Sequence, residues 1–116
     1  MGKKRYVKHF LDDITESIEK IDEYSNSLTE EQFLVSVEKQ DAISRRIEII
    51  GEAVKNIPED IRYMFPEVQW KKVAGLRDVV IHNYFGINPK RLWKIIKQDL
   101  PILNQQIILI KTRLKD

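Results

Sequence analysis

Residues 7–21 read VKHFLDDITESIEKI, and their apolar side chains recur every three or four positions. Such spacing places them on one side of an α-helix, with the acidic side chains on the other sides. An amphipathic helix buries its apolar side only against a partner, so this stretch predicts a helical bundle. We expect the helix to run from about Lys4 to Tyr24. Its apolar positions are Val7, Phe10, Leu11, Ile14, Ile18 and Ile21. We expect His9, near the start of this helix, to be structural or exposed, without a partner.

The helical period continues along the chain, and no stretch favours a β-strand. Thr29 and Gln32 form a capping box for a second helix, and Asn88 followed by Pro89 caps the last one, in which Pro101 predicts a kink. The fold class that we expect is all-α, an up-and-down bundle of four main helices plus one short helix. The further helices are predicted at about residues 30–56, 58–65, 75–84 and 89–114, with Pro58 as the first residue of the second of these and Gly86 ending the third. The apolar side of 30–56 includes Val37, and that of 89–114 consists of Leu92, Ile95, Ile96, Leu100, Leu103, Ile107, Ile110 and Leu114.

Length and composition restrict the possible classes of protein. A chain of 116 residues suits a single domain over 1–116, and the lack of cysteine excludes disulfides and thiolate metal sites. The basic start is followed by an amphipathic segment, and there is no apolar run of membrane-spanning length. We therefore expect a cytoplasmic protein with no signal peptide.

Charge is distributed unevenly along the chain, although the formal net charge is only +2. Residues 12–60 carry fourteen Asp or Glu against five Lys or Arg, whereas residues 61–116 carry eleven Lys or Arg against four acids. A basic half is the sign expected of a surface that meets RNA or nucleotide phosphates. Solvated basic helix faces are common, so charge alone does not decide the function.

Residues 75–84 read GLRDVVIHNY and place a cation, a carboxylate, an imidazole and a phenol within ten positions. The spacing is R-x-x-x-x-H-x-Y, formed by Arg77, His82 and Tyr84, with Asp78 beside the arginine. On one helix Arg77 and His82 project about 140° apart, whereas Asp78 and His82 share a face. A second copy of the helix across a twofold axis would bring imidazole and guanidinium groups into one cleft, so a homodimer is part of the functional hypothesis.

These residue types suit cleavage of a phosphodiester. An imidazole can take a proton from a ribose hydroxyl or give one to a leaving oxygen, and guanidinium matches phosphate oxygens. In this reading His82 and Arg77 are catalytic and Asp78 orients the imidazole. Neither a metal nor another cofactor is required. The same residues could instead be an exposed histidine, a solvated ion pair and a core tyrosine.

A polar stripe on the predicted helix 30–56 is the second candidate for function. It consists of Asp41, Arg45, Glu48 and Glu52, which share one helix face. Alternating charges at this spacing are typical of a solvated ion-pair ladder. Alternatively the stripe faces a cleft or a dimer partner, and Gly51 beside Glu52 would allow another backbone to approach closely. The sequence leaves these three possibilities open.

Residues 36–103 resemble the HepT toxins of prokaryotic type II toxin–antitoxin pairs, which are members of the HEPN superfamily. The resemblance is carried by IIGEA at 49–53, Trp70 ahead of GLRD at 75–78, the R-x-x-x-x-H-x-Y core and YFG at 84–86. It implies a helical dimer in which paired motifs form a cleft that cleaves RNA without metal. Arg77 and His82 would then be catalytic, with Asp78 as the polar residue that follows the arginine.

The resemblance also implies a partner and a regulatory modification. HepT toxins are neutralised by an MntA-type minimal nucleotidyltransferase antitoxin, which transfers AMP to the tyrosine of the motif, here Tyr84. An anionic nucleotide two residues from His82 would block RNA and engage the same cations. The alternative is a non-catalytic helical dimer that serves as a binding module for a nucleotidyltransferase, and a weaker reading is a purely structural dimer.

Overall fold

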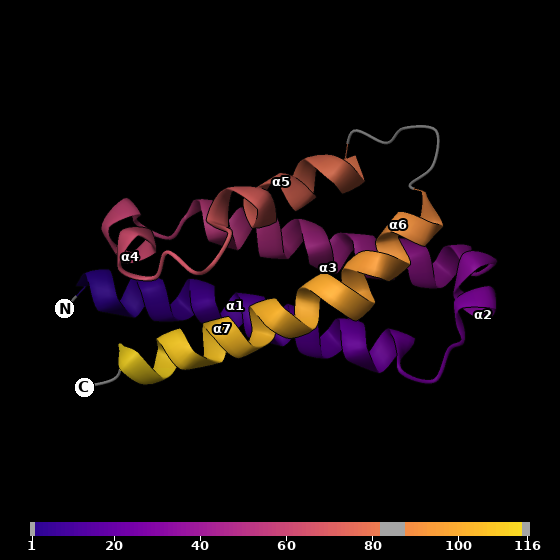
Figure 1. Ribbon diagram of the computed structural model, residues 1–116, viewed down its shortest axis with the longest axis horizontal. Coiled ribbons are helices and arrows are strands. Elements are labelled where there is room, and N and C mark those ends of the chain that lie inside the picture. Colours follow the sequence, from indigo (N-terminus) through magenta and orange to yellow (C-terminus); the bar gives the residue numbers. More distant parts are fainter. Residues whose placement is uncertain (1, 82–87, 115–116) are drawn as a thin grey trace.

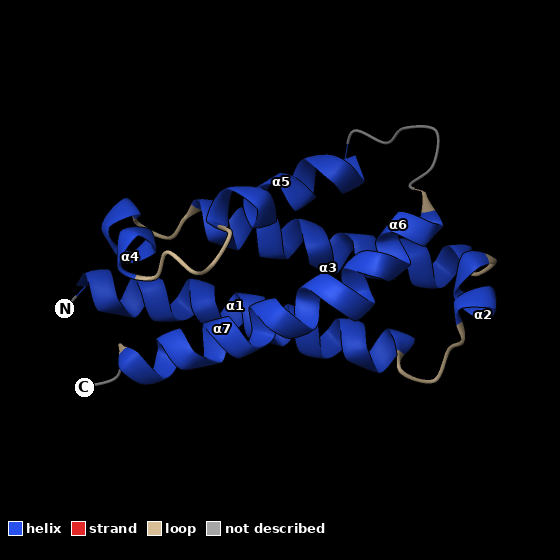
Figure 2. Cartoon of the chain, in the orientation of Figure 1, coloured by secondary structure: helices blue, strands red, loops and turns tan. Residues whose placement is uncertain are grey.

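The computed structural model describes residues 2–81 and 88–114 of the chain. All regular secondary structure over these residues is helical, as Figure 2 shows, which confirms the predicted all-α class. None of the helices in these ranges combines the length and the apolar character needed to cross a membrane. The elements are α1 (Gly2–Ser25), α2 (Glu30–Leu34), α3 (Val37–Lys55), α4 (Glu59–Met64), α5 (Trp70–Ile81), α6 (Pro89–Lys94), a π-helical segment (Ile95–Asp99) and α7 (Leu100–Arg113).

The long helices lie along one direction and form an elongated bundle of 46 × 27 × 22 Å. Helix α1 packs against both α3 and α7, and α3 also packs against α5. In Figure 1, α5 returns along α3 in the opposite direction, while the short helices α2 and α4 lie at opposite ends of the bundle. The predicted up-and-down arrangement is therefore present.

The core consists of the apolar faces that the helical spacing predicts. In α1, five of the six predicted positions are at most 2% exposed, and Phe10 is partly buried against the core. In the last helical stretch every predicted apolar position is buried except Leu114, which is partly buried. Each fully buried Leu or Ile side chain stabilises the fold by roughly 1.5–3 kcal/mol relative to an exposed one. These apolar contacts hold α3 and α5 in their relative positions.

The predicted helix 30–56 is wrong in one respect, because the chain forms two helices there. Ser36 ends the continuity: its side chain accepts a hydrogen bond from the backbone N–H of Lys39 and caps α3. The Gln40 amide donates to the carbonyl oxygens of Phe33 and Leu34, which satisfies the end of α2. Val37, predicted on the apolar face, is consequently 67% exposed. The predicted capping box of Thr29 and Gln32 is confirmed.

The helix that carries the motif begins earlier than predicted, at Trp70. The Trp70 indole N–H donates to the carbonyl oxygens of Arg62 and Phe65, and the ring is only 8% exposed, which fixes the start of α5 against the end of α4. Gly75 therefore lies inside α5. Pro58, predicted as the first helical residue, is instead the N-cap of α4, which begins one residue later at Glu59.

The last helix contains a π-helical segment where a simple kink was predicted. Asn88 caps α6 with its side chain and Pro89 follows it, as predicted. The segment Ile95–Asp99 then precedes Pro101, and the N–H of Leu100 donates to the carbonyl oxygen of Ile95, five residues earlier. Pro101 has no N–H to continue a regular ladder, so the wider turn accommodates it within one helical stretch.

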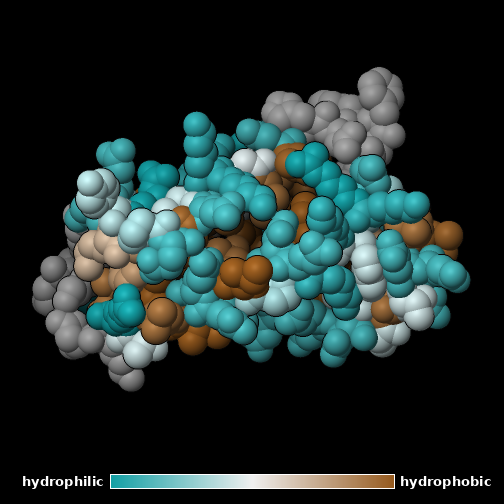
Figure 3. All heavy atoms as spheres, in the orientation of Figure 1, coloured by the Kyte–Doolittle hydropathy of each residue, from teal (hydrophilic) through white to brown (hydrophobic). Residues whose placement is uncertain are grey.

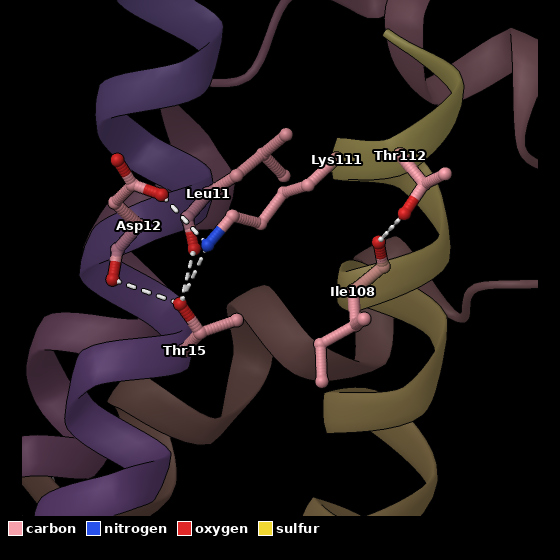
Figure 4. Close-up of polar contacts among 6 residues, drawn as sticks. All are labelled: Leu11, Asp12, Thr15, Ile108, Lys111 and Thr112. Atoms are coloured by element: carbon pink, nitrogen blue, oxygen red, sulfur yellow. Dashed lines mark hydrogen bonds and ion pairs between the residues drawn. The ribbon is translucent and has the colours of Figure 1, made fainter. Parts of the chain in front are cut away.

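Polar contacts tie the C-terminal helix to the first one, as Figure 4 shows. The Lys111 ammonium lies 2.7 Å from Asp12 Oδ1 and donates to Thr15 Oγ1 at 3.2 Å. Both contacts are partly exposed, so their net contribution to stability is modest. They fix the relative register of α1 and α7.

Candidate functional site

A hollow of about 280 Å³ opens beside Arg77, where α1, α3 and α5 meet. We call it the Arg77 hollow. Each of the three helices contributes side chains, so its shape depends on the packing of the bundle. The polar and aromatic residues that define it are Phe10 and Asp13 from α1, Arg45, Glu48 and Glu52 from α3, Asn56 at the end of α3, and Arg77 from α5.

Arg77 is held in place by an ion pair across the two packed helices. Its Nε donates to Glu52 Oε2 at 2.9 Å, and the side chains of Arg77 and Glu52 are 35% and 57% exposed. One bond at Nε uses one of the five guanidinium donors. A phosphate that enters the hollow would therefore meet a guanidinium whose plane is already fixed along one edge.

Gly51 explains how α5 comes close enough to α3 for this pair to form. A Cβ at residue 51 would lie 2.8 Å from Arg77 Cβ, 3.1 Å from Arg77 N and 3.2 Å from Ala74 O. Only a glycine allows the α5 backbone to approach this point of α3 without a shift. The prediction that Gly51 permits a close backbone approach is confirmed, and the approaching backbone is that of Arg77 itself.

Three residues of the predicted polar stripe line the Arg77 hollow. Arg45 and Glu48 pair with each other at 3.1 Å, and Glu52 pairs with Arg77. Asp41, three turns before Glu52, is exposed and is not among the lining residues. The structure therefore brings most of the stripe to the hollow. Because the acidic half of the chain supplies α1 and α3, the hollow carries both signs of charge and is not uniformly basic.

The other motif residues are described only in part. Asp78 is an exposed residue of α5 that follows Arg77 and projects about 100° away from it around the helix. His82 and Tyr84 lie outside the described residues, and so does the predicted helix end at Gly86. That the His82 imidazole and the Arg77 guanidinium share one cleft therefore stays a prediction from the sequence.

His9 and Phe10 add groups that the motif did not single out. The imidazole of His9 lies 3.7 Å from Asp13 Oδ2 and packs edge-on against the Phe10 ring, with 5.5 Å between centroids. Asp13 and Phe10 both line the hollow. His9 was predicted to be structural or exposed, without a partner. The i, i+4 spacing to Asp13 was the signal that could have identified the pair.

A second hollow lies between α5 and α7 and has a more apolar lining. Val73, Leu76, Leu100 and Leu103 contribute to it. Figure 3 shows apolar atoms at the bottom of a depression on this face, surrounded by hydrophilic side chains. Over the residues that the structure describes, no cluster of three or more His, Asp or Glu side chains has an arrangement suited to a metal ion.

Comparison with known proteins identifies the family. The model of the HepT-like family, described as ribonuclease HepT-like, matches residues 14–110. This protein, an all-α bundle with the Arg77 hollow on its surface, therefore belongs to a family of helical ribonucleases. The chain is a member of the HepT-like ribonuclease family, as the resemblance of the motif predicted.

The relatives include proteins of similar length and one longer protein. The chain is 46% identical over 100 residues to "Probable ribonuclease HepT" of Thermococcus cleftensis, which covers 86% of the chain and 91% of that protein. It is 41% identical over 107 residues to "Putative RNase MJ1380" of Methanocaldococcus jannaschii, covering 92% and 98% of the two. It also matches "Gamma-glutamylcyclotransferase and putative RNase MJ0434" of that organism, with 43% identity over 111 residues. That match covers 96% of the chain but only 50% of the longer relative. No solved structure shows significant similarity.

Proposed function

We propose that the protein is a metal-independent endoribonuclease of the toxin type and that Arg77, His82 and Asp78 form its catalytic set. The observation that carries the proposal is the placement of Arg77, which lies at the edge of a surface hollow with its guanidinium held by Glu52. Membership of the HepT-like family and the names of the relatives support an RNA substrate.

The proposed chemistry is transfer of a phosphodiester to the neighbouring ribose oxygen. His82 takes the proton of the 2′-hydroxyl as the 2′ oxygen bonds to phosphorus, and the bond from phosphorus to the 5′ oxygen breaks. The leaving oxygen receives a proton from an imidazolium, and the products are a 2′,3′-cyclic phosphate and a 5′-hydroxyl. Arg77 stabilises the charge that develops on the equatorial oxygens of the phosphorus. Asp78, four residues before His82 in the sequence, orients the imidazole.

A homodimer completes the site in this proposal. Arg77 and His82 diverge around a single helix, whereas a twofold axis beside α5 would let the arginine of one subunit work with the histidine of the other. The mixed charge of the Arg77 hollow fits this arrangement, because the acids hold the cations in position and the second subunit brings further cations.

Regulation by a nucleotidyltransferase antitoxin, which the resemblance to the HepT toxins implies, is part of the same proposal. Tyr84 is two residues from His82, so transfer of AMP to its phenol oxygen would place phosphate and base beside the catalytic groups. The added negative charge would compete with the RNA backbone for Arg77. Such a modification would switch off cleavage without unfolding the bundle.

The test is cleavage of a single-stranded RNA in the presence of excess EDTA. The wild-type protein is expected to release fragments with cyclic phosphate ends, and His82→Ala and Arg77→Ala are expected to release none. Lys20→Ala, a change on α1 in the acidic half, serves as the control for preparation and folding. Equal cleavage by wild type and His82→Ala would refute the catalytic assignment. Tight RNA or partner binding without cleavage by the wild type would favour the binding module instead.

A further inference from the structure

The basic side chains of α6 and the π-helical segment form a surface of one charge sign outside the Arg77 hollow. Residues 79–98 contain no Asp or Glu and four Lys or Arg. Lys90, Lys94 and Lys97 recur at intervals of four and three residues, which places them along one side of the helix. All three are exposed. We call these three lysines the α6 basic face, and Figure 3 shows hydrophilic side chains over this part of the molecule.

The ammonium groups of the α6 basic face are not neutralised by carboxylates of the described residues. The ion pairs among the described residues involve other cations, such as Arg77, Arg45 and Lys111. Lys97 instead lies over the Trp93 ring, with Nζ 4.7 Å from the centroid. A cation–π contact fixes the side of the helix on which the ammonium lies and leaves its charge available to an anion.

Local packing makes this face a rigid one. Trp93 packs against the fully buried Phe33 of α2, with ring centroids 5.2 Å apart, and Leu92, Ile95 and Ile96 are buried beneath it. The π-helical turn at Ile95–Asp99 sets the direction of Lys97 relative to Lys94. Cations on a rigid support lose less conformational freedom on binding than cations on a mobile loop.

The α6 basic face also lies close to the motif along the chain. Helices α5 and α6 both pack against α3, and in Figure 1 the C-terminal end of α5 lies on the side of the bundle where α6 begins. Only seven peptide steps separate Ile81 from Asn88, which limits their separation to roughly 25 Å. A polyanion that occupies the catalytic motif thus has a row of cations within reach.

We infer that the α6 basic face binds the phosphates of single-stranded RNA on one side of the cleavage point. This inference rests on the proposed ribonuclease function and adds a substrate-binding surface to it. The partner is RNA because the face presents unneutralised charge at regular spacing and little exposed apolar surface. Lysine ammonium groups bind phosphate as point charges and do not read the base sequence. The surface would thus provide affinity without sequence preference.

The test is the salt dependence of RNA binding, measured by fluorescence anisotropy with a 2′-O-methyl RNA that cannot be cleaved. For single strands the slope of log Kd against log salt changes by about 0.7 for each phosphate contact. Lys90→Gln/Lys94→Gln should therefore reduce the slope by about 1.4. From 50 to 200 mM salt its Kd should rise roughly sevenfold less than that of the wild type. With cleavable RNA, KM should rise and kcat should stay unchanged.

Two matched variants separate charge from structure. Lys90→Arg/Lys94→Arg keeps both cations and should keep the wild-type slope, whereas Lys20→Gln/Lys55→Gln removes two cations from the acidic half and should also keep it. An unchanged slope in Lys90→Gln/Lys94→Gln would overturn the inference. If that result came with wild-type RNA cleavage that depends on His82, the ribonuclease proposal would stand. Absence of RNA binding by the wild type would overturn both.

Discussion

Glu52 of α3 accepts a charge-assisted hydrogen bond from Arg77 Nε of α5, over 2.9 Å. Both side chains are substantially exposed, at 57% and 35%, so solvent screens the pair and its effect on the free energy of unfolding is at most about 1 kcal/mol. The bond matters more for orientation, because it restrains an arginine that could otherwise adopt many rotamers. We propose that Glu52 acts on Arg77 as a positioning residue.

Glu52→Ala should therefore lower kcat much more than it lowers stability. Loss of the restraint lets the guanidinium leave its position, and misplacement by about 1 Å can cost up to about 100-fold in rate. RNA affinity should stay equal or improve, since a carboxylate leaves the neighbourhood of the phosphates. Steady-state kinetics with a labelled RNA and a urea melt of the same preparation measure both effects.

A conservative change at Glu52 and a change at a distant glutamate are the controls for Glu52→Ala. Glu52→Gln keeps an oxygen acceptor for Nε and should retain an intermediate kcat. Glu38→Gln removes the same charge from an exposed position in the first turn of α3, about 21 Å along the helix from Glu52, and should behave as wild type. A Glu52→Ala variant with unchanged kcat would rule out the positioning role.

Gly51→Ala should disturb the site through the backbone. The new Cβ would meet Arg77 Cβ at 2.8 Å and two backbone atoms of α5 at 3.1 and 3.2 Å, so α3 and α5 would have to separate. Overpacking of this kind costs about 1–3 kcal/mol in the free energy of unfolding. Arg77 would move with the α5 backbone, and cleavage should fall together with stability. Urea unfolding followed by circular dichroism, with a cleavage assay below the transition, measures the two losses.

Gly75→Ala is the matched control on the partner helix. A Cβ at residue 75 meets no atom within 4 Å, and the residue lies inside α5. Alanine in a helix interior is favoured over glycine by roughly 0.5–1 kcal/mol, so this variant should be slightly more stable than wild type. If Gly51→Ala were equally well tolerated, the close approach of the two helices would not constrain Arg77.

The sequence predicts most of this fold because helical spacing of apolar residues reports directly on burial. What it missed are interruptions that depend on single polar contacts. Ser36 caps α3 and Gln40 satisfies the end of α2, yet both lie within a stretch that reads as one periodic helix. Likewise Pro101 indicates an irregularity in the last helix but does not decide between a kink and a π-helical turn.

The sequence predicts which residues belong to the candidate site, but it does not predict which of them contact each other. The motif identified Arg77, and the stripe identified Glu52, but nothing in their spacing linked two residues that are twenty-five positions apart. Gly51 was the clue, since a glycine inside a helix permits a close approach by some other element. Which element approaches is set by the topology of the bundle, and topology is a property of the whole chain.

Subunit mixing should show whether one site uses residues of two chains. If Arg77 of one subunit acts with His82 of the other, a heterodimer of Arg77→Ala and His82→Ala subunits contains one intact site and one that lacks both groups. Random exchange makes half of the dimers heterodimers, so about one quarter of the wild-type activity should return. Cleavage assays before and after exchange measure the recovery. Persistent inactivity, with exchange verified by native mass spectrometry, would place both residues of each site on one chain.

Tyr84→Phe should separate cleavage from its regulation. The phenol oxygen is the proposed acceptor of AMP and has no part in the proton transfers assigned to His82, so the variant should cleave RNA at close to the wild-type rate. Co-incubation with an MntA-type nucleotidyltransferase and ATP should inactivate the wild type and add the mass of AMP to it, as intact-mass spectrometry would show. The variant should gain no mass and stay active.

Tyr63, which is 87% exposed on α4, supplies the control, because Tyr63→Phe should be modified and inactivated like the wild type. If modification persisted in Tyr84→Phe and were lost in Tyr63→Phe, the acceptor of AMP would be Tyr63 on α4, away from the motif. Inhibition would then need an explanation other than competition with RNA for Arg77.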